Sequence, residues 1–125
     1  MVERTPPEAQ DIPIHGDVEG ARLAVLRLLE QRPDMSQREL SESLGLSLGK
    51  THYVLHALLD KGLVKARNFK RSDRKLAYAY VLTPSGMSEK LRLTQSFLRR
   101  KEDEFEALQR TIATLRSELA NSSAE

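Results

Sequence analysis

The segment SLGKTHYVLHALLDKG, residues 47–62, combines a row of side chains suited to burial with a row that could bind a polar ligand. Thr51, Val54, Leu55 and Leu58 recur at the i, i+3, i+4, i+7 spacing of a buried helix face. The remaining face has three potential proton donors and an aromatic ring, and no carboxylate precedes Asp60. Its members are Gly49, Lys50, His52, Tyr53 and His56.

Metal binding and catalysis suit this face poorly. His52 and His56 lie one turn apart and could chelate a metal, but only Asp60 is in phase to supply a further ligand, so no metal site is expected. Ser36 and Ser47 are better explained as helix caps than as nucleophiles. Because the chain shows no Ser/His/Asp order, glycine-rich phosphate loop or paired carboxylates, we expect neither an enzyme nor a cofactor.

Charge is concentrated in one short segment. From Gly62 to Leu82 six basic residues face a single acidic one, Asp73, although the whole chain carries a formal charge of only +2. Such a cluster is typical of a surface that binds a polyanion, and equally of a solvated lysine-rich loop. The six are Lys65, Arg67, Lys70, Arg71, Arg74 and Lys75.

Length and composition set wider limits. The 125 residues allow one domain plus an extension, and residues 1–16 are expected to form a disordered, proline-rich arm. The chain has no cysteine, so disulfides and thiolate metal sites are excluded. Charged residues interrupt every apolar stretch, which predicts a soluble cytoplasmic protein without membrane contact.

Capping residues predict where three helices begin. Asp17 can cap a helix over residues 18–31, and the sequence SQRE at 36–39 is a capping box for a short helix that ends near Gly45. Ser47 can then cap the third helix, which is expected to end near Gly62. The sequence therefore predicts a helix, a second helix, a tight turn and a third helix.

Two strands and a long helix follow. LVKARNF and LAYAYVLT alternate with a period of two, and the polar segment KRSDRK, residues 70–75, is expected to be the hairpin loop between them. Thr83 and Pro84 are suited to the cap and first position of a last helix over residues 84–120, with a disordered tail at 121–125.

A heptad row runs along this last helix. The residues step by alternating four and three positions, which favours a self-associating coiled coil over a single amphipathic helix packed on its own domain. Leu93 and Phe97 lie off the row and could anchor the helix to the globular part. The row consists of Met87, Leu91, Thr94, Leu98, Lys101, Phe105, Leu108, Ile112, Leu115 and Leu119.

The order of elements predicts a mainly α fold with a small β-hairpin: a winged helix-turn-helix over residues 17–83, followed by a long C-terminal coiled-coil helix. In this fold the third helix enters the major groove of double-stranded DNA and the hairpin, or wing, contacts the flanking backbone. We therefore predict DNA contacts from two groups of residues. They are Ser47, Gly49, Lys50, His52, Tyr53 and His56 on the helix, and Lys70, Arg71, Arg74 and Lys75 on the wing.

The sequence from SQRELSESLGLSLGKTHY through LAYAYVLTPSG resembles the MarR-type winged-helix regulators, and within them the small subgroup associated with bacterial exopolysaccharide gene clusters. The resemblance covers about residues 17–119. It implies a homodimeric transcriptional regulator of exopolysaccharide genes, with residues 47–53 at the tip of the DNA-reading helix and residues 70–75 in the wing.

The sequence departs from this family in two ways. Asp73 and Arg74 are adjacent, whereas MarR wings separate an Asp and an Arg by one residue, and the proline-rich arm is a poor source of a dimerisation helix. The last helix must then supply most of the dimer, and a small-molecule effector is not identified. Whether two copies of the last helix pair in parallel or antiparallel orientation stays open. The dimer residues expected are Leu91, Leu98, Phe105, Leu108, Ile112, Leu115 and Leu119.

An alternative assignment uses the same fold without DNA. The winged helix and coiled coil could form a protein-interaction module, but such a surface would favour exposed aromatic residues over clustered cations. The basic segment at residues 62–82 therefore favours DNA.

Overall fold

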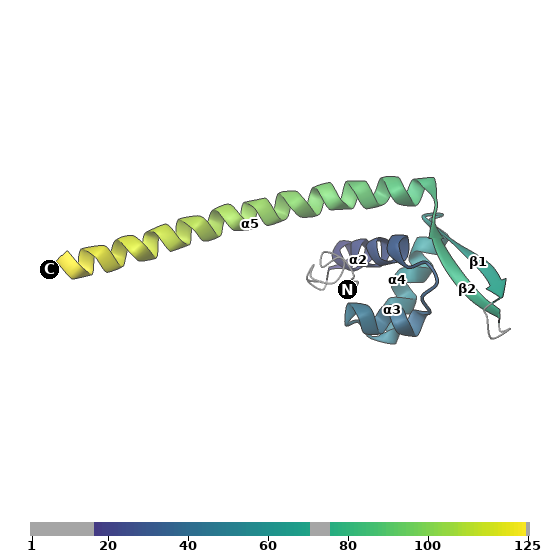
Figure 1. The fold of residues 1–125 in the computed structure, drawn as a ribbon. Helices are drawn as coiled ribbons and strands as arrows, with labels where there is room; N and C mark the ends of the chain where they lie inside the picture. Colours follow the sequence, from purple (N-terminus) through teal and green to yellow (C-terminus); the bar gives the residue numbers. More distant parts are fainter. Residues whose placement is uncertain (1–16, 71–75, 125) are drawn as a thin grey trace, which may run out of the picture. The chain divides into compact units, whose positions relative to one another are not determined.

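The computed structural model describes residues 17–70 and 76–124, which form four helices and two strands in the order α2, α3, α4, β1, β2, α5 (Figure 1). This is the fold class predicted from the sequence. The arm expected for residues 1–16 lies outside the described residues. The chain divides into two compact units, the first ending at Leu93 and the second beginning at Thr94. The first turns of the last helix therefore belong to the winged unit, beyond the boundary expected at residue 83.

Helix α2, Val18–Gln31, is the centre of the first unit and contacts α3, α4 and β2. Asp17 begins it as predicted, because its side chain accepts a hydrogen bond from the Gly20 amide at 2.6 Å. Most of the helix is buried, including Leu26 and Val25 at 0% exposure. Burial on nearly every side makes α2 the platform on which the other elements pack.

Helices α3, Gln37–Leu44, and α4, Leu48–Asp60, form the helix-turn-helix pair. The predicted capping box is present: the Glu39 amide donates to Ser36 Oγ at 3.1 Å, and the Ser36 amide donates to Glu39 Oε1 at 2.9 Å. Gly45 ends α3 with a φ of 68°, in the left-handed region that favours glycine. Ser47 follows as the cap of α4, which makes the turn short and fixed.

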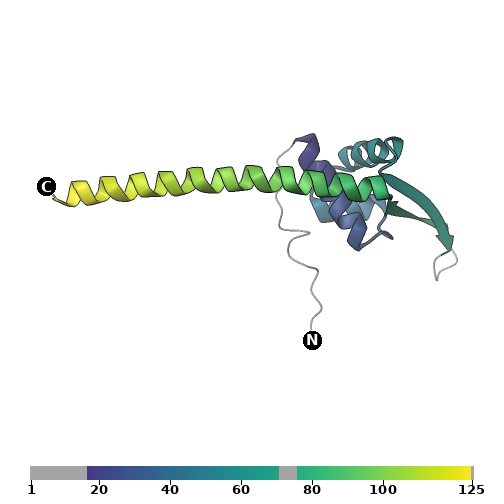
Figure 2. The same ribbon diagram turned by 90° about the horizontal axis from the view of Figure 1, so that it is seen from above.

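Strands β1, Val64–Lys70, and β2, Leu76–Leu82, pair in antiparallel register from Val64 opposite Leu82 to Lys70 opposite Leu76. They extend away from the three helices in both views (Figures 1 and 2). Lys70 is thus a strand residue, not the first residue of the loop as expected, because backbone pairing continues one residue further than the alternating pattern indicates.

The ends of α4 and β2 meet the start of α5 at Thr83. The Thr83 hydroxyl donates to the Gly62 carbonyl oxygen at 2.6 Å and accepts a hydrogen bond from the Gly86 amide at 3.0 Å. The Thr83 amide also donates to the Leu63 carbonyl oxygen at 3.0 Å. The predicted helix cap is therefore also the junction of three elements.

Helix α5, Pro84–Ala124, is one continuous helix. It continues past residue 120, so the tail expected from residue 121 is helical through Ala124, because no proline or glycine interrupts the chain after Gly86. Leu93 is 2% exposed and anchors the first turns, as predicted. Phe97, the other anchor expected, is half-buried in the second unit, where the Lys101 ammonium lies 5.1 Å from its ring centroid.

Ion pairs tie α2 to the first turns of α5 within the winged unit. Arg22 lies 3.5 Å from Glu89, and Lys90 pairs with Glu30 at 2.5 Å. Glu89 also accepts hydrogen bonds from Arg92 at 2.8 and 2.9 Å. These hydrogen bonds, with the charge of the guanidinium groups, hold the pKa of Glu89 below its ordinary value.

Candidate nucleic-acid interface

The buried side of α4 fixes the helix in place. Thr51, Val54, Leu55 and Leu58 are all buried, as the spacing predicts. At its N-terminus Ser47 Oγ accepts a hydrogen bond from the Lys50 amide at 3.0 Å, and the hidden Thr51 hydroxyl donates back to the Ser47 carbonyl oxygen at 2.9 Å. Thr51 thus fills its place in the core with its hydroxyl satisfied.

The opposite side of α4 is exposed. Tyr53 is 67% exposed, and Ser47, Gly49, His52 and His56 are also exposed. Lys50 is half-buried. A β-carbon built on Gly49 would meet no atom within 4 Å, so this part of the helix backbone is open to close approach. Five of the six helix residues predicted to contact DNA are therefore accessible to a partner, and Lys50 is partly so.

The two histidines contact each other. The rings of His52 and His56 lie 4.0 Å apart at their centroids with an interplanar angle of 40°, and His52 Nδ1 lies 3.1 Å from Gln37 Oε1. This contact with Gln37 holds the His52 ring in one orientation on the exposed side of α4. Among residues 17–70 and 76–124 no group of three or more His, Cys, Asp or Glu side chains is placed to hold a metal ion.

Gln37 is a site residue that sequence reasoning missed. Gln37 is the first residue of α3, and the capping-box pattern in the sequence identifies only Ser36 and Glu39 there. Its contact with His52 joins residues fifteen positions apart, so helix periodicity gives no sign of it. Gln37 orients a ring on the exposed face of α4 and stands beside that face itself.

The wing is only partly described. Arg71, Arg74 and Lys75 lie outside the described residues, and of Lys70 only the backbone position in β1 is described. The two earlier cations of the basic segment, Lys65 and Arg67, are exposed. They lie at alternate positions of β1, so both are on the strand face opposite Val64, which is 3% exposed.

Tyr80 packs β2 against the rest of the winged unit. It is 8% exposed, and its amide donates to the Pro33 carbonyl oxygen at 2.9 Å, which fixes β2 to the turn after α2. Tyr78 is 57% exposed, and its ring is stacked on Tyr80 with 6.3 Å between centroids. Tyr78, on the hairpin, is thus a second accessible aromatic ring in addition to Tyr53 on α4.

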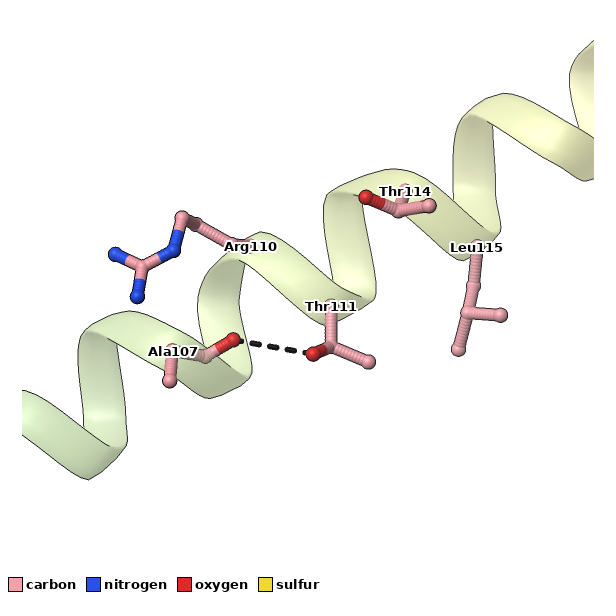
Figure 3. A pocket seen from close by; sticks show the side chains of 5 residues that line it. All are labelled: Ala107, Arg110, Thr111, Thr114 and Leu115. Carbon is pink, nitrogen blue, oxygen red and sulfur yellow. Dashed lines mark hydrogen bonds between the residues drawn. The ribbon is translucent and has the colours of Figure 1, made fainter.

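The apolar members of the heptad row of α5 lie at the surface in the part of the chain that the structure describes. Its large side chains remain exposed, from 39% for Ile112 to 71% for Leu119. Figure 3 shows a hollow on this stretch, where Thr111 Oγ1 donates to the Ala107 carbonyl oxygen at 3.1 Å. Its lining residues all come from two turns of the same helix, so opposing walls that would enclose a small ligand are missing there.

No helix in the two described ranges is both long and apolar enough to cross a membrane. Helix α5 is the longest of these helices, and charged residues interrupt its apolar residues along its length.

Comparison with known proteins supports the winged helix-turn-helix. Residues 20–65 match the family model described as winged helix-turn-helix DNA-binding, which spans α2 to the start of β1. No match was found among curated protein sequences.

Several solved structures share this fold. A PadR-like regulator from Bacillus cereus superimposes with a TM-score of 0.64 at 19% identity, covering 70% of this chain and 90% of that one. A transcriptional regulator homologue from Pyrococcus horikoshii gives 0.54 at 22%, covering 77% and 96%. MarR of E. coli in its apo form gives 0.51 at 24% identity, covering 60% of this chain and 54% of MarR. At these identities the likeness shows the fold, and the chain therefore has the winged helix-turn-helix fold that the sequence predicts.

Proposed function

We propose that this chain is a homodimeric, sequence-specific DNA-binding transcriptional regulator whose helix α4 enters the major groove. The observation that carries the proposal is the division of α4 into a fully buried side and an exposed side without a carboxylate before Asp60. A major groove about 12 Å wide admits one helix, and a face free of acidic groups can approach phosphates without repulsion.

Each residue of the α4 segment that was predicted to contact DNA has a role in this proposal. Lys50 donates to guanine or to a phosphate, and the His52 ring can donate to or accept from a base edge. His56 can donate or accept, and Tyr53 contacts a phosphate or a thymine methyl group. Ser47 and Gly49, at the N-terminal end, lie where the helix amides favour a phosphate.

Cations of the hairpin extend the contact to the backbone. Lys70, Arg71, Arg74 and Lys75 form the wing contacts, with an arginine entering the flanking minor groove. The exposed Lys65 and Arg67 on β1 add positive charge to the same segment, which neutralises phosphates and does not read bases.

Assembly and target follow from two separate arguments. The exposed apolar row of α5 supports a homodimer, because water-exposed leucines at heptad spacing are stabilised by a second helix. Two α4 helices would then enter successive major grooves about 34 Å apart. The resemblance to exopolysaccharide-associated regulators supports genes for exopolysaccharide production as the target, where occupancy would block or assist polymerase.

The proposal is tested by selecting bound fragments from random duplex DNA with the purified protein. The expected result is a palindromic consensus. Lys50→Ala and His52→Ala should each lose about 1 to 3 kcal/mol on that consensus and less on random DNA, because a base contact contributes discrimination. Arg110→Ala removes one positive charge from the exposed side of α5 and serves as the control that keeps the full preference. A stable dimer that enriches no sequence would instead be a protein-interaction module.

A further inference from the structure

The apolar row of α5 is uneven along its length. Its C-terminal half is formed by large apolar side chains only, from Phe105 to Leu119. The N-terminal half contains the two polar members of the row, Thr94 and Lys101, which occupy the same heptad position in two consecutive heptads. Any second helix that covers the row must face these two residues, and the orientation of that helix decides what they meet.

A parallel pair in register would bring each residue against its own copy. Thr94 would face Thr94 and Lys101 would face Lys101, so two layers would lack a large apolar side chain. The second of these layers would also confine two ammonium groups between leucine and phenylalanine layers. Water screens charges poorly there, so the repulsion and the lost hydration act together against this orientation.

An antiparallel pair symmetrical about Asp103 gives every layer at least one large apolar residue. Thr94 then faces Ile112, and Lys101 faces Phe105, whose aromatic ring is a favourable surface for an ammonium group. Lys101 already lies 5.1 Å from the Phe97 ring centroid and 3.2 Å from Glu104 within its own helix, so it is suited to a site with rings and carboxylates. The remaining layers are Met87 with Leu119, Leu91 with Leu115, and Leu98 with Leu108.

This arrangement has one unfavourable consequence. Glu102 and Glu104 flank the row, and each would lie close to its own copy at the centre of the pair. Both are exposed on the helix edge, where water and salt screen like charges. A screened repulsion at the edge is smaller than that of two ammonium groups inside an apolar layer, so the balance still favours the antiparallel pair.

We infer that the occupant of the apolar row of α5 is a second copy of this chain in antiparallel orientation, with Lys101 of each copy facing Phe105 of the other. The inference rests on the proposed homodimer and adds its orientation and register. It places the N-terminal ends of the two α5 helices at opposite ends of the paired segment.

The natural absence of cysteine makes the inference directly testable by disulfide crosslinking. Leu98→Cys and Leu108→Cys face each other in the proposed register, whereas each lies about 15 Å along the axis from its own copy, too far for a disulfide. An equimolar mixture of the two variants, one carrying a mass tag, is exchanged and oxidised. The expected product is the mixed disulfide, with little crosslinking of either variant alone. Thr94→Cys with Ile112→Cys is a second pair with the same expectation.

The outcomes separate the orientation from the dimer. Arg110→Cys, on the outer side of the helix, is the control that should not crosslink. Sedimentation before oxidation establishes the mass of each variant. Dimers in which Leu98→Cys and Leu108→Cys each crosslink to themselves, or in which no mixed disulfide forms, would overturn the antiparallel register and leave the proposed function intact. Monomers of the unmodified chain would overturn both.

Discussion

Gly86, in the first turn of α5, lies directly against the carbonyl group of Leu63, in the turn that follows α4. A β-carbon built on Gly86 would overlap the Leu63 oxygen and lie 3.0 Å from its carbonyl carbon. The backbone of Gly86 is helical, so space and not conformation requires glycine here. At Gly62, by contrast, the φ of 72° is the requirement, since the surrounding space is open.

Replacing Gly86 with alanine should therefore destabilise the fold. The added methyl group forces backbone away from backbone, which typically costs about 1 to 3 kcal/mol. Gly49→Ala is the matched control, because it adds the same methyl group to a helix in open space and should be neutral or stabilising by up to about 1 kcal/mol. Urea unfolding of both variants measures the difference. Equal free energies of unfolding would show that α5 does not press on Leu63.

Glu89→Gln should make stability less dependent on pH in the acid range. The folded state holds the pKa of Glu89 below its ordinary value, chiefly through the Arg92 hydrogen bond, so the carboxylate contributes stability above an unfolded pKa of about 4.3. That contribution is lost as the pH falls through the folded pKa. Wild type should melt at a higher temperature than Glu89→Gln at pH 7, and the two should converge in strong acid. Glu42→Gln, at an exposed position of α3, is the control and should melt at the wild-type temperature both at pH 7 and in strong acid. A difference in melting temperature between wild type and Glu89→Gln that persists in strong acid would contradict the ion-pair explanation.

Charges placed in the heptad row should dissociate the proposed dimer. Replacing Leu108 and Ile112 together with Asp puts two carboxylates per copy into apolar layers, at a cost of several kcal/mol of association free energy. Replacing Ala107 and Thr114 with Asp adds the same charge to the outer side of the same turns and should leave the mass unchanged. Sedimentation measures the mass of the assembly that each double variant forms. If all three proteins have the same mass, the row is not the dimer contact.

The wing should act through phosphates, although its arginines lie outside the described residues. Each phosphate neutralised steepens the dependence of log affinity on log salt by about 0.9, and a dimer counts every substitution twice. Changing Arg71 and Arg74 to alanine should therefore make the slope shallower by up to roughly 3 to 4. Changing Arg99 and Arg110 to alanine removes the same number of cations from α5 and should leave the slope of log affinity against log salt unaltered. A folded wing variant with the wild-type slope would show that the wing does not touch DNA.

Local signals predicted the local features of this fold. The capping box at Ser36 and Glu39, the left-handed Gly45 and the cap at Ser47 involve residues within three or four positions of one another, so the sequence alone specifies their geometry. The start of β2 at Leu76 was predicted correctly, and the other three strand ends differ from the prediction by one residue. Lys70 joined the strand because backbone pairing takes no account of side-chain polarity.

Contacts between distant residues were not predictable in the same way. Three such contacts form only after the helices have packed, and the periodicity of the sequence indicates none of them. They are Gln37 with His52, Tyr80 with Pro33, and Gly86 with Leu63. The roles of the α4 and wing residues toward DNA stay predictions for a different reason. They depend on the groups of a partner molecule, and burial within one chain reports only that the α4 face is accessible.

The junction at Thr83 also has a consequence for how the protein opens. One hydroxyl group holds the end of α4 through Gly62 and the first turn of α5 through Gly86, so neither helix end can fray without breaking a bond that serves the other. The amide protons of Thr83 and Gly86 should then show the same protection factor in exchange with solvent deuterium, set by a single opening event. The last turns of α5 should exchange faster and independently. Thr83→Val, which keeps the shape and removes the hydroxyl, should uncouple the two amides.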